Sequence, residues 1–263
     1  MNINTKWITE YNKSDNIDSI ALWDKNIFVT SKSSNNIHVY DLDGYLIGKF
    51  GEDVLKRPNG IIALQNILFV VERDNHRVHM FSLPDLKSIG IIGEDVLKYP
   101  YGITGYYDGN FIIYVTDQKD LKVYKFVLYE DTYDYYSFGC KLGKLESILV
   151  DRKYNRLLVA DEKYKNIKIY DLDGKYVGVI NGLFCGEPEG IVLSDYGFYI
   201  FTDQDKVKNT FHIVSRDELL YIDSFYSHDV KNTDGIAIDG DSFYAIHDDG
   251  SLSAFDLQDI LNN

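Results

Sequence analysis

Six residues that can each offer an oxygen atom recur along the sequence at intervals of 41 to 45 residues, always directly before a small residue and an isoleucine. They are Asp18, Asn59, Tyr101, Glu146, Glu189 and Asp234. Four carboxylates brought to one place repel one another unless a cation neutralises them or some of them take up protons. Calcium tolerates many oxygen ligands in irregular geometry better than magnesium does. The pattern therefore predicts a Ca²⁺ site whose ligands include Asp18, Asn59, Glu146, Glu189 and Asp234.

A second set of charged residues follows the second apolar run of each repeat. The set comprises Lys32, Glu72 with Arg73, Asp117 with Lys119, Asp161 with Glu162, Asp203, and His247 with Asp248. Acidic and basic groups on one face suit a phosphate group whose charge is shared between a metal ion and Lys or Arg side chains. This set thus predicts a site for a phosphorylated ligand beside the metal.

The elements that position these residues are predicted by the repeat itself. Its small residues are Ser19, Gly60, Gly102, Ser147, Gly190 and Gly235, and a period of 40 to 50 residues is typical of propeller blades. Within each unit, apolar and polar residues alternate, as over residues 36–40 and 166–170, which indicates half-buried β-strands. We predict an all-β fold, a six-bladed β-propeller of four-stranded antiparallel blades. Helical repeats share this period, but the alternation argues against them.

The last unit, from Gly235 to Phe255, contains only three strand patterns before a short tail of helical pattern, Leu257 to Leu261. The N-terminal segment 5–11 has strand composition. We therefore expect the N-terminal strand to complete blade six, because ring closure removes an exposed sheet edge. Residues 1–263 are expected to form a single propeller domain.

Composition narrows the function classes. The chain carries 27 Lys and Arg against 41 Asp and Glu, a net charge of −14, which argues against nucleic-acid binding. No apolar run is long enough for a membrane-spanning helix, and the N-terminus lacks the apolar segment of a secretory signal, so a cytoplasmic location is expected. Cys140 and Cys185 are then expected to be free thiols. The six histidines are dispersed, form no Ser-His-Asp grouping and are expected mostly on strand surfaces.

Two recurring phrases have a structural explanation. Asp-Leu-Asp-Gly at Asp41 and at Asp171 lacks the downstream Glu of a calcium-binding loop, so turn chemistry explains it. Gly-Glu-Asp-Val-Leu-Lys begins at both Gly51 and Gly93, before units two and three, and is interpreted as a duplicated connector.

The motifs together resemble those of the β-propeller phytases, calcium-dependent enzymes that hydrolyse phosphate monoesters of inositol hexakisphosphate. The similar segments span all six units and are residues 18–23 with 29–33, the hairpin 39–44, 72–75, 101–103 with 115–119, 146–147 with 159–162, 187–190 and 232–236. The chain departs from the family in its shorter length, in Ser147 and Asn232 where the family has Gly and Asp, and in a Lys at 119 that is displaced by one place.

The resemblance implies a function and roles for individual residues. Calcium would be held by Asp18, Glu146, Asp161, Glu189 and Asp234, with Tyr101 assisting, while Lys32, Arg73 and Lys119 would hold the phosphate of the substrate. The protein would then be a calcium-dependent phosphomonoester hydrolase that acts on an inositol phosphate or a similar polyanion through a metal-activated water.

Two other functions remain compatible with the sequence. Propellers with NHL-type repeats share the Pro-Glu-Gly-Ile phrase found at residues 188–191, and such a protein could bind a protein partner on its rim, or a small molecule, without turnover. A lactonase-type hydrolase would hold a single metal through Glu189, Asn59 and Asp234.

Overall fold

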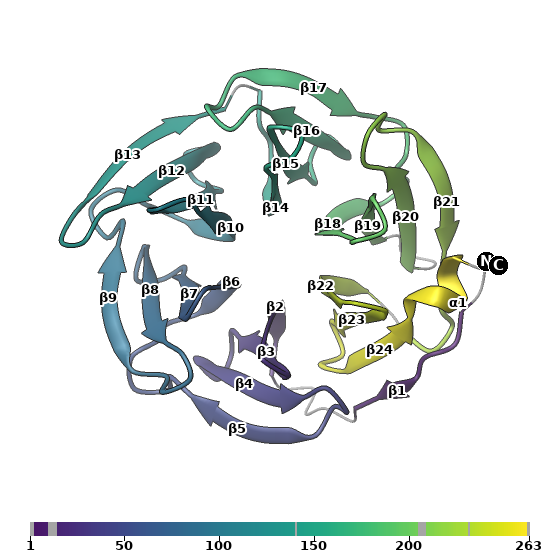
Figure 1. The fold of residues 1–263 in the computed structure, drawn as a ribbon, viewed down its shortest axis with the longest axis horizontal. Coiled ribbons are helices and arrows are strands. Elements are labelled where there is room, and N and C mark those ends of the chain that lie inside the picture. The colour runs from purple at the N-terminus through teal and green to yellow at the C-terminus, as the bar shows by residue number, and fades with distance from the viewer. Residues whose placement is uncertain (1–2, 10–14, 140, 205–208, 231, 262–263) are drawn as a thin grey trace.

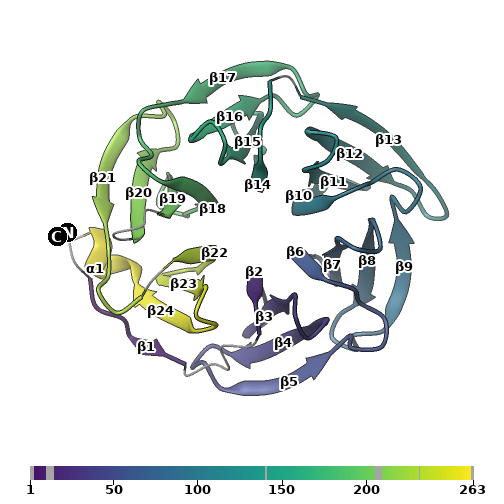
Figure 2. The same ribbon diagram turned by 180° about the vertical axis from the view of Figure 1, so that it is seen from behind.

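A computed structural model describes residues 3–9, 15–139, 141–204, 209–230 and 232–261. Within these ranges, six four-stranded antiparallel sheets stand in a ring around a central channel (Figures 1 and 2). The prediction of an all-β, six-bladed propeller is confirmed. The charged ring predicted from the repeats can therefore form, because the first strand of every blade faces the channel.

The strands follow the chain from the channel outward in blades one to five, and in blade six the outermost strand is the N-terminal one. Blade one contains β2 (Ile17–Trp23), β3 (Asn26–Ser31), β4 (Asn36–Asp41) and β5 (Leu46–Phe50). Blade two contains β6 (Pro58–Leu64), β7 (Ile67–Glu72), β8 (Arg77–Ser82) and β9 (Ser88–Ile92). Blade three contains β10 (Pro100–Tyr107), β11 (Phe111–Asp117), β12 (Lys122–Leu128) and β13 (Tyr133–Phe138).

The second half of the ring repeats this order. Blade four contains β14 (Leu145–Asp151), β15 (Arg156–Asp161), β16 (Asn166–Tyr170) and β17 (Tyr176–Ile180). Blade five contains β18 (Glu187–Leu193), β19 (Phe198–Gln204), β20 (Asn209–Ser215) and β21 (Tyr221–Phe225). Blade six contains β22 (Thr233–Asp239), β23 (Ser242–His247), β24 (Leu252–Asp256) and the N-terminal β1 (Trp7–Ile8), and α1 (Leu257–Leu261) follows β24.

Blade six is closed by the N-terminus, as predicted. Trp7 pairs with Ala254 and Ile8 with Ser253, and backbone bonds at Lys6 and Thr9 extend this contact by one residue on each side. The strand is shorter than the segment 5–11 expected from composition, and residues 10 and 11 lie outside the described ranges. Joining the two ends of the chain in one sheet closes the ring of blades.

The hydrophobic core lies between neighbouring blades. One cluster packs Phe28 and Val39 of blade one against Leu68 and Phe81 of blade two, and similar clusters occupy the other junctions. The two middle strands of a blade are covered on both faces, so β7 is almost fully buried. Burial of these apolar side chains is the main stabilising contribution to the ring.

A bulge near the start of each inner strand sets the position of the predicted ligands. The pairing of inner strand and second strand shifts register there in all six blades. The small residue after the bulge lets neighbouring inner strands approach closely: a Cβ on Gly60 would lie 2.5 Å from the Tyr101 carbonyl oxygen, and one on Gly102 would lie 2.4 Å from the Glu146 carbonyl oxygen. The small residue is therefore required by packing around the channel.

The turns and connectors behave as their sequences predict. The Asp41 carboxylate accepts hydrogen bonds from the backbone N–H groups of Asp43 at 3.0 Å and Tyr45 at 2.9 Å, and Asp171 does the same in its own hairpin. Both duplicated connectors form a turn from Gly51 or Gly93 that buries a leucine four residues later. These two phrases are explained by local structure.

Candidate functional site

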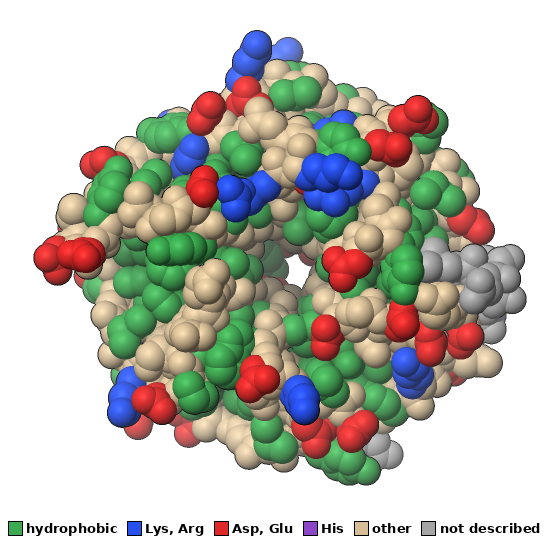
Figure 3. All heavy atoms as spheres, viewed as in Figure 1, with side chains coloured by type: hydrophobic (Ala, Val, Ile, Leu, Met, Phe, Trp, Pro, Cys, Tyr) green, Lys and Arg blue, Asp and Glu red, His purple; other side chains and the backbone are tan. Residues whose placement is uncertain are grey.

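The central channel contains a cavity of about 410 Å³ that all six inner strands line. Five of the six residues predicted from the repeat lie on its wall: Asp18, Tyr101, Glu146, Glu189 and Asp234. We call these five, together with Lys32 and Glu162, the acidic mouth. Figure 3 shows the channel as an opening in the middle of one face of the molecule.

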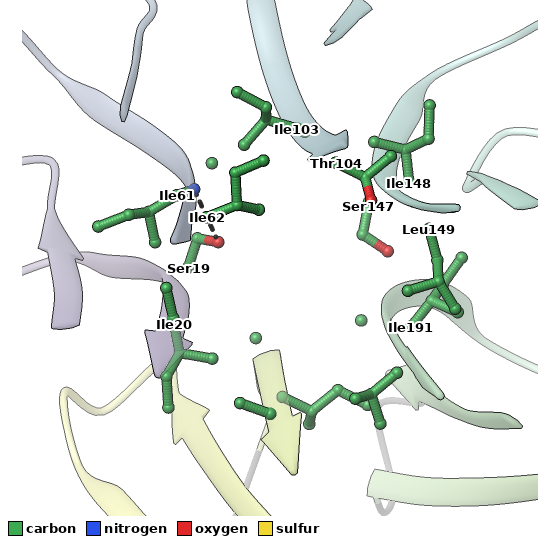
Figure 4. Close-up of a pocket in the computed structure, with 18 of the residues that line it drawn as sticks. Ser19, Ile20, Ile61, Ile62, Ile103, Thr104, Ser147, Ile148, Leu149 and Ile191 are labelled. Atoms are coloured by element: carbon green, nitrogen blue, oxygen red, sulfur yellow. Dashed lines mark hydrogen bonds between the residues drawn. The ribbon is translucent and has the colours of Figure 1, made fainter. Parts of the chain in front are cut away.

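The remainder of the channel wall is largely aliphatic. Figure 4 shows Ile20, Ile62 and Leu149 around the cavity, and the hydroxyl groups of Ser19 and Ser147 among them. The Ser19 hydroxyl accepts a hydrogen bond of 3.4 Å from the backbone N–H of the second blade's inner strand. The cavity thus combines carboxylates with an apolar wall.

On one side of the acidic mouth, Lys32 and Tyr101 hold Asp18. The Tyr101 hydroxyl donates to Asp18 Oδ1 at 2.8 Å, Lys32 Nζ donates to the Tyr101 oxygen at 3.2 Å, and Lys32 also forms an ion pair with Asp18. Burial opposes the charge on Lys32, but the adjacent Asp18 carboxylate outweighs it and raises the pKa of the ammonium. Burial, reinforced by Asp18, also raises the pKa of Tyr101, so its hydroxyl stays protonated and remains a donor.

On the other side, three carboxylates converge. One oxygen from each of Glu146, Glu162 and Glu189 lies within 4.8 Å of the others. Glu146 is 2% exposed; its Oε1 accepts from Gln118 Nε2 at 3.0 Å and pairs with Lys144 Nζ at 3.1 Å, whereas Oε2 has no hydrogen-bond partner among the described residues. Burial raises the pKa of Glu146 to about 8. Burial and the neighbouring Glu146 charge raise the pKa of Glu189 well above its ordinary value.

Asp234 completes the acidic mouth. Gln204 Nε2 donates to Asp234 Oδ1 at 2.6 Å. Burial, followed by the charges of Asp248 and Asp18, raises the pKa of Asp234 to about 9. The raised pKa values of Glu146, Glu189 and Asp234 favour their protonated forms at neutral pH when no cation is bound, because burial disfavours the charged forms and neighbouring carboxylates add to this.

The structure does not bring all predicted site residues to the cavity. Asn59 is fully buried, its side-chain nitrogen and oxygen have no partner among the described residues, and it is not part of the cavity wall. Arg73 stacks on the Tyr99 ring, 4.4 Å from its centre, and its Nε donates to Asp74 at 3.3 Å. Lys119 is exposed at the end of its turn.

Asp161 has a different role from the predicted one. Its carboxylate accepts hydrogen bonds from the backbone N–H groups of Gly143 at 2.8 Å and Tyr164 at 3.3 Å. Asp117 and Asp203 hold the connectors of their blades in the same way. In these three blades the aspartate at the end of the second strand, last or last but one, is thus a loop anchor, and Asp161 is absent from the channel wall.

The residue after this anchor is the one that reaches the mouth. Lys32 and Glu162 both take this place, and so does Gln118, which stands where the displaced Lys119 was expected to act. Glu162 already belongs to the second predicted set, and aligning the six units on this position would have added Gln118. Nothing in the repeat singles out Lys144, because it belongs to the connector before its blade.

Comparison with known proteins supports the fold alone. No protein family and no curated protein matches the sequence. Among solved structures, a chain of a nidogen–laminin complex is 18% identical with a TM-score of 0.69, and the match covers 84% of each chain. Virginiamycin B lyase from Staphylococcus aureus is 12% identical with a TM-score of 0.67, covering 95% of this chain and 98% of the lyase. A streptogramin B lyase is 14% identical with a TM-score of 0.67, covering 94% and 97%.

These neighbours include an enzyme and a binding complex, and neither function transfers at such identities. The resemblance to phytases receives no support of its own from them. No helix in the described part of the chain has the length and apolarity needed to span a membrane.

Proposed function

We propose that this protein is a calcium-dependent phosphomonoester hydrolase whose cation binds in the acidic mouth. The observation that carries the proposal is the convergence of Glu146, Glu162 and Glu189, with ligand oxygens within 4.8 Å of one another, around a buried Glu146 oxygen that lacks a partner among the described residues. Carboxylate oxygens are the ligands that calcium prefers, so the residues present fit the ion.

The charge balance of the mouth also favours a cation. Five carboxylates, those of Asp18, Glu146, Glu162, Glu189 and Asp234, face the ammonium groups of Lys32 and Lys144. Packing ionised carboxylates this closely costs free energy unless a cation offsets it. If all five are ionised, the excess is three negative charges; a divalent ion offsets two of them and helps an anionic substrate to approach.

Side chains in and beside the mouth then have defined roles in binding the substrate. When bound, calcium supplies positive charge that neutralises a phosphoryl group. Lys32 directs two of its three donors to Asp18 and Tyr101, which leaves one for a phosphate oxygen. Tyr101 keeps Lys32 in place through Asp18, and Arg73, at the equivalent position of the next blade, would contact the substrate from the rim.

The test begins with metal-stripped protein. Calcium binding is measured by calorimetry and by the shift in Tm, and phosphate release is then followed with inositol hexakisphosphate and with p-nitrophenyl phosphate. We expect calcium to raise Tm and to be required for release from at least one ester. Glu146→Gln and Glu162→Gln should lose both responses.

Glu187→Gln is the matched control, because this exposed glutamate begins the same strand as Glu189. It should bind calcium as the native chain does. An unchanged calcium response in Glu146→Gln, or no response in the native chain, would refute the metal site. Calcium binding without hydrolysis of either ester would refute the phosphatase activity and favour the non-catalytic binding function.

The aliphatic channel wall favours a second candidate, a lactonase-type hydrolase. Ile20, Ile62 and Leu149 beside the carboxylates suit an apolar substrate group better than a polyanion. The ligand set expected for that activity is incomplete, since Asn59 does not line the cavity. Adding dihydrocoumarin to the calcium-loaded protein tests it: ring opening without phosphate release would replace the phosphatase proposal.

A further inference from the structure

A second cavity, of about 420 Å³, lies away from the channel between blades four and five. Its wall is formed by the connector that follows β17 and by β20 and β21, and β17 and β21 are neighbours on the outer ring in Figure 1. Ile180, Leu183 and Leu219 give it an apolar surface, and His212 and Tyr221 add polar groups. The acidic mouth contributes no residue to this cavity.

His212 is fixed in one orientation by a buried carboxylate. Asp203 is 2% exposed and accepts hydrogen bonds from the backbone N–H groups of Cys185 at 3.0 Å and Gly186 at 2.8 Å, and from His212 Nε2 at 3.2 Å. Burial opposes the charge on Asp203, but these bonds outweigh it and lower its pKa. An ionised Asp203 only accepts, so Nε2 carries a proton, and Nδ1 is the acceptor in the neutral form of the ring.

The Nδ1 atom of His212 is buried and has no hydrogen-bond partner among the described residues. The side chain itself is 8% exposed. A buried acceptor without a partner costs free energy, and native proteins rarely leave one. The expectation that the histidines lie mostly on strand surfaces is wrong, because four of the six are buried: His38, His79, His212 and His247.

Blade two shows what satisfies the same histidine. His79 occupies the equivalent place, and its Nδ1 contacts Glu72 at 3.0 Å while its Nε2 contacts the Ser88 hydroxyl at 2.7 Å. The Phe81 ring stacks on the imidazole with centroids 4.3 Å apart. In blade two, an aromatic ring therefore covers the imidazole of His79 and a hydroxyl group is the hydrogen-bond partner of its second nitrogen.

In the described part of blade five no ring stacks on the imidazole and no hydroxyl group bonds to it, although Phe184 packs edge-on against His212 with ring centroids 5.5 Å apart. The strand registers align Phe81 and Ser88 of blade two with Val214 and Tyr221 of blade five. Val214 is too small to cover the imidazole, and Tyr221 is 53% exposed with its ring centroid 6.3 Å from that of His212. Val214 and Tyr221, which stand where blade two has the ring and the hydroxyl, both line the cavity beside His212.

We propose that this cavity binds a small phenol, whose ring takes the place of Phe81 over the imidazole and whose hydroxyl donates to His212 Nδ1 as Ser88 does to His79. The apolar side chains of Ile180, Leu183 and Leu219 bury the ring. The exposed Tyr221 side chain turns outward to admit it. The site is independent of the metal in the acidic mouth.

The experiment follows histidine ¹⁵N resonances during titration with phenol, anisole and toluene, with the signals of His79 and His212 assigned from the variants His79→Gln and His212→Gln. Phenol should shift the Nδ1 resonance of His212 saturably and leave His79 unchanged. Anisole and toluene, which cannot donate, should bind roughly three- to tenfold more weakly, the range expected for the loss of one hydrogen bond.

Two variants refill the cavity with the residues of blade two. Val214→Phe and Tyr221→Ser, alone or together, should weaken phenol binding at least tenfold. Ile222→Ser is the control, because Ile222 is exposed on the same strand and does not line the cavity. Equal affinity for phenol and anisole in the native chain, an unmoved His212 signal, or undiminished binding by Tyr221→Ser would overturn the proposal even if Val214→Phe does not fold.

Discussion

Replacing Glu146 by glutamine should stabilise the metal-free protein while it removes calcium binding. Burial raises the pKa of Glu146 from 4.5 to about 8, so the folded state binds more protons than the unfolded state between these two values. Stability therefore falls as pH rises through this window. At pH 7 the difference of 2.5 pH units from the unfolded pKa corresponds to about 3 kcal/mol, at ~1.4 kcal/mol per unit.

Glutamine does not titrate, so the gap in the free energy of unfolding between Glu146→Gln and the native chain should grow with pH. We expect a gap near zero at pH 4.5 and about 3 kcal/mol at pH 7. Urea unfolding in the presence of a chelator, at pH 5, 6, 7 and 8, measures it, with Glu187→Gln as the control. Saturating calcium should reverse the order, because only the native chain gains binding free energy.

The reasoning fails if Glu146→Gln is less stable than the native chain at pH 8 without metal, or if the gap does not depend on pH. Either result would mean that Glu146 is ionised and satisfied in the folded protein without a cation. A Glu187→Gln curve that followed Glu146→Gln would instead indicate a general effect of removing negative charge.

Three further changes test the fold around the site. Burial lowers the pKa of His247 to about 4, so the unfolded state takes up a proton before the folded state does as pH falls from 6.5 to 4. Over this range the free energy of unfolding of the native chain should fall by about 3 kcal/mol relative to that of His247→Gln, measured by urea unfolding. A difference that does not change with pH would contradict this. Gly102→Ala should cost about 2 kcal/mol, because its Cβ would meet the next inner strand's carbonyl at 2.4 Å, whereas Gly178→Ala, with no atom within 4 Å, should change Tm little. Lys32→Met should cost about 3 kcal/mol by leaving Asp18 unpaired, and a neutral result would show that the ion pair contributes nothing.

The positions around the channel could be predicted because the repeat places one such residue near the start of the inner strand of every blade. Asp18, Glu146 and Glu189 each precede a small residue at a regular interval, and the bulge at that place brings all three to the cavity. Asn59 was placed by the same rule, yet it lies outside the cavity wall, because the rule specifies where the backbone is and not how each side chain is covered.

Within the second set, Asp161 and Lys119 lie one place away from residues that reach the mouth. Asp161 and Glu162 were both visible, but successive side chains of a strand point in opposite directions, so a shift of one residue exchanges a loop anchor for a channel group. The same shift separates Lys119 from Gln118. A sequence pattern does not tell which of two adjacent residues faces the channel, whereas their hydrogen-bond partners in the structure do.

By itself, the sequence determined the number of blades, the four-stranded pattern, the closure by the N-terminal strand and the turn role of Asp41, because each follows from a local period or a local hydrogen bond. Only the tertiary structure decided which carboxylates meet and that His212 Nδ1 has no hydrogen-bond partner among the described residues. Glu146 and Glu162 meet through the pairing of β14 with β15, and Glu189 joins them from the neighbouring blade. His212 differs from His79 through Val214 on its own strand and Tyr221 on the next one. The energies of such contacts depend on distances in space, and these distances do not follow from the spacing of residues in the sequence.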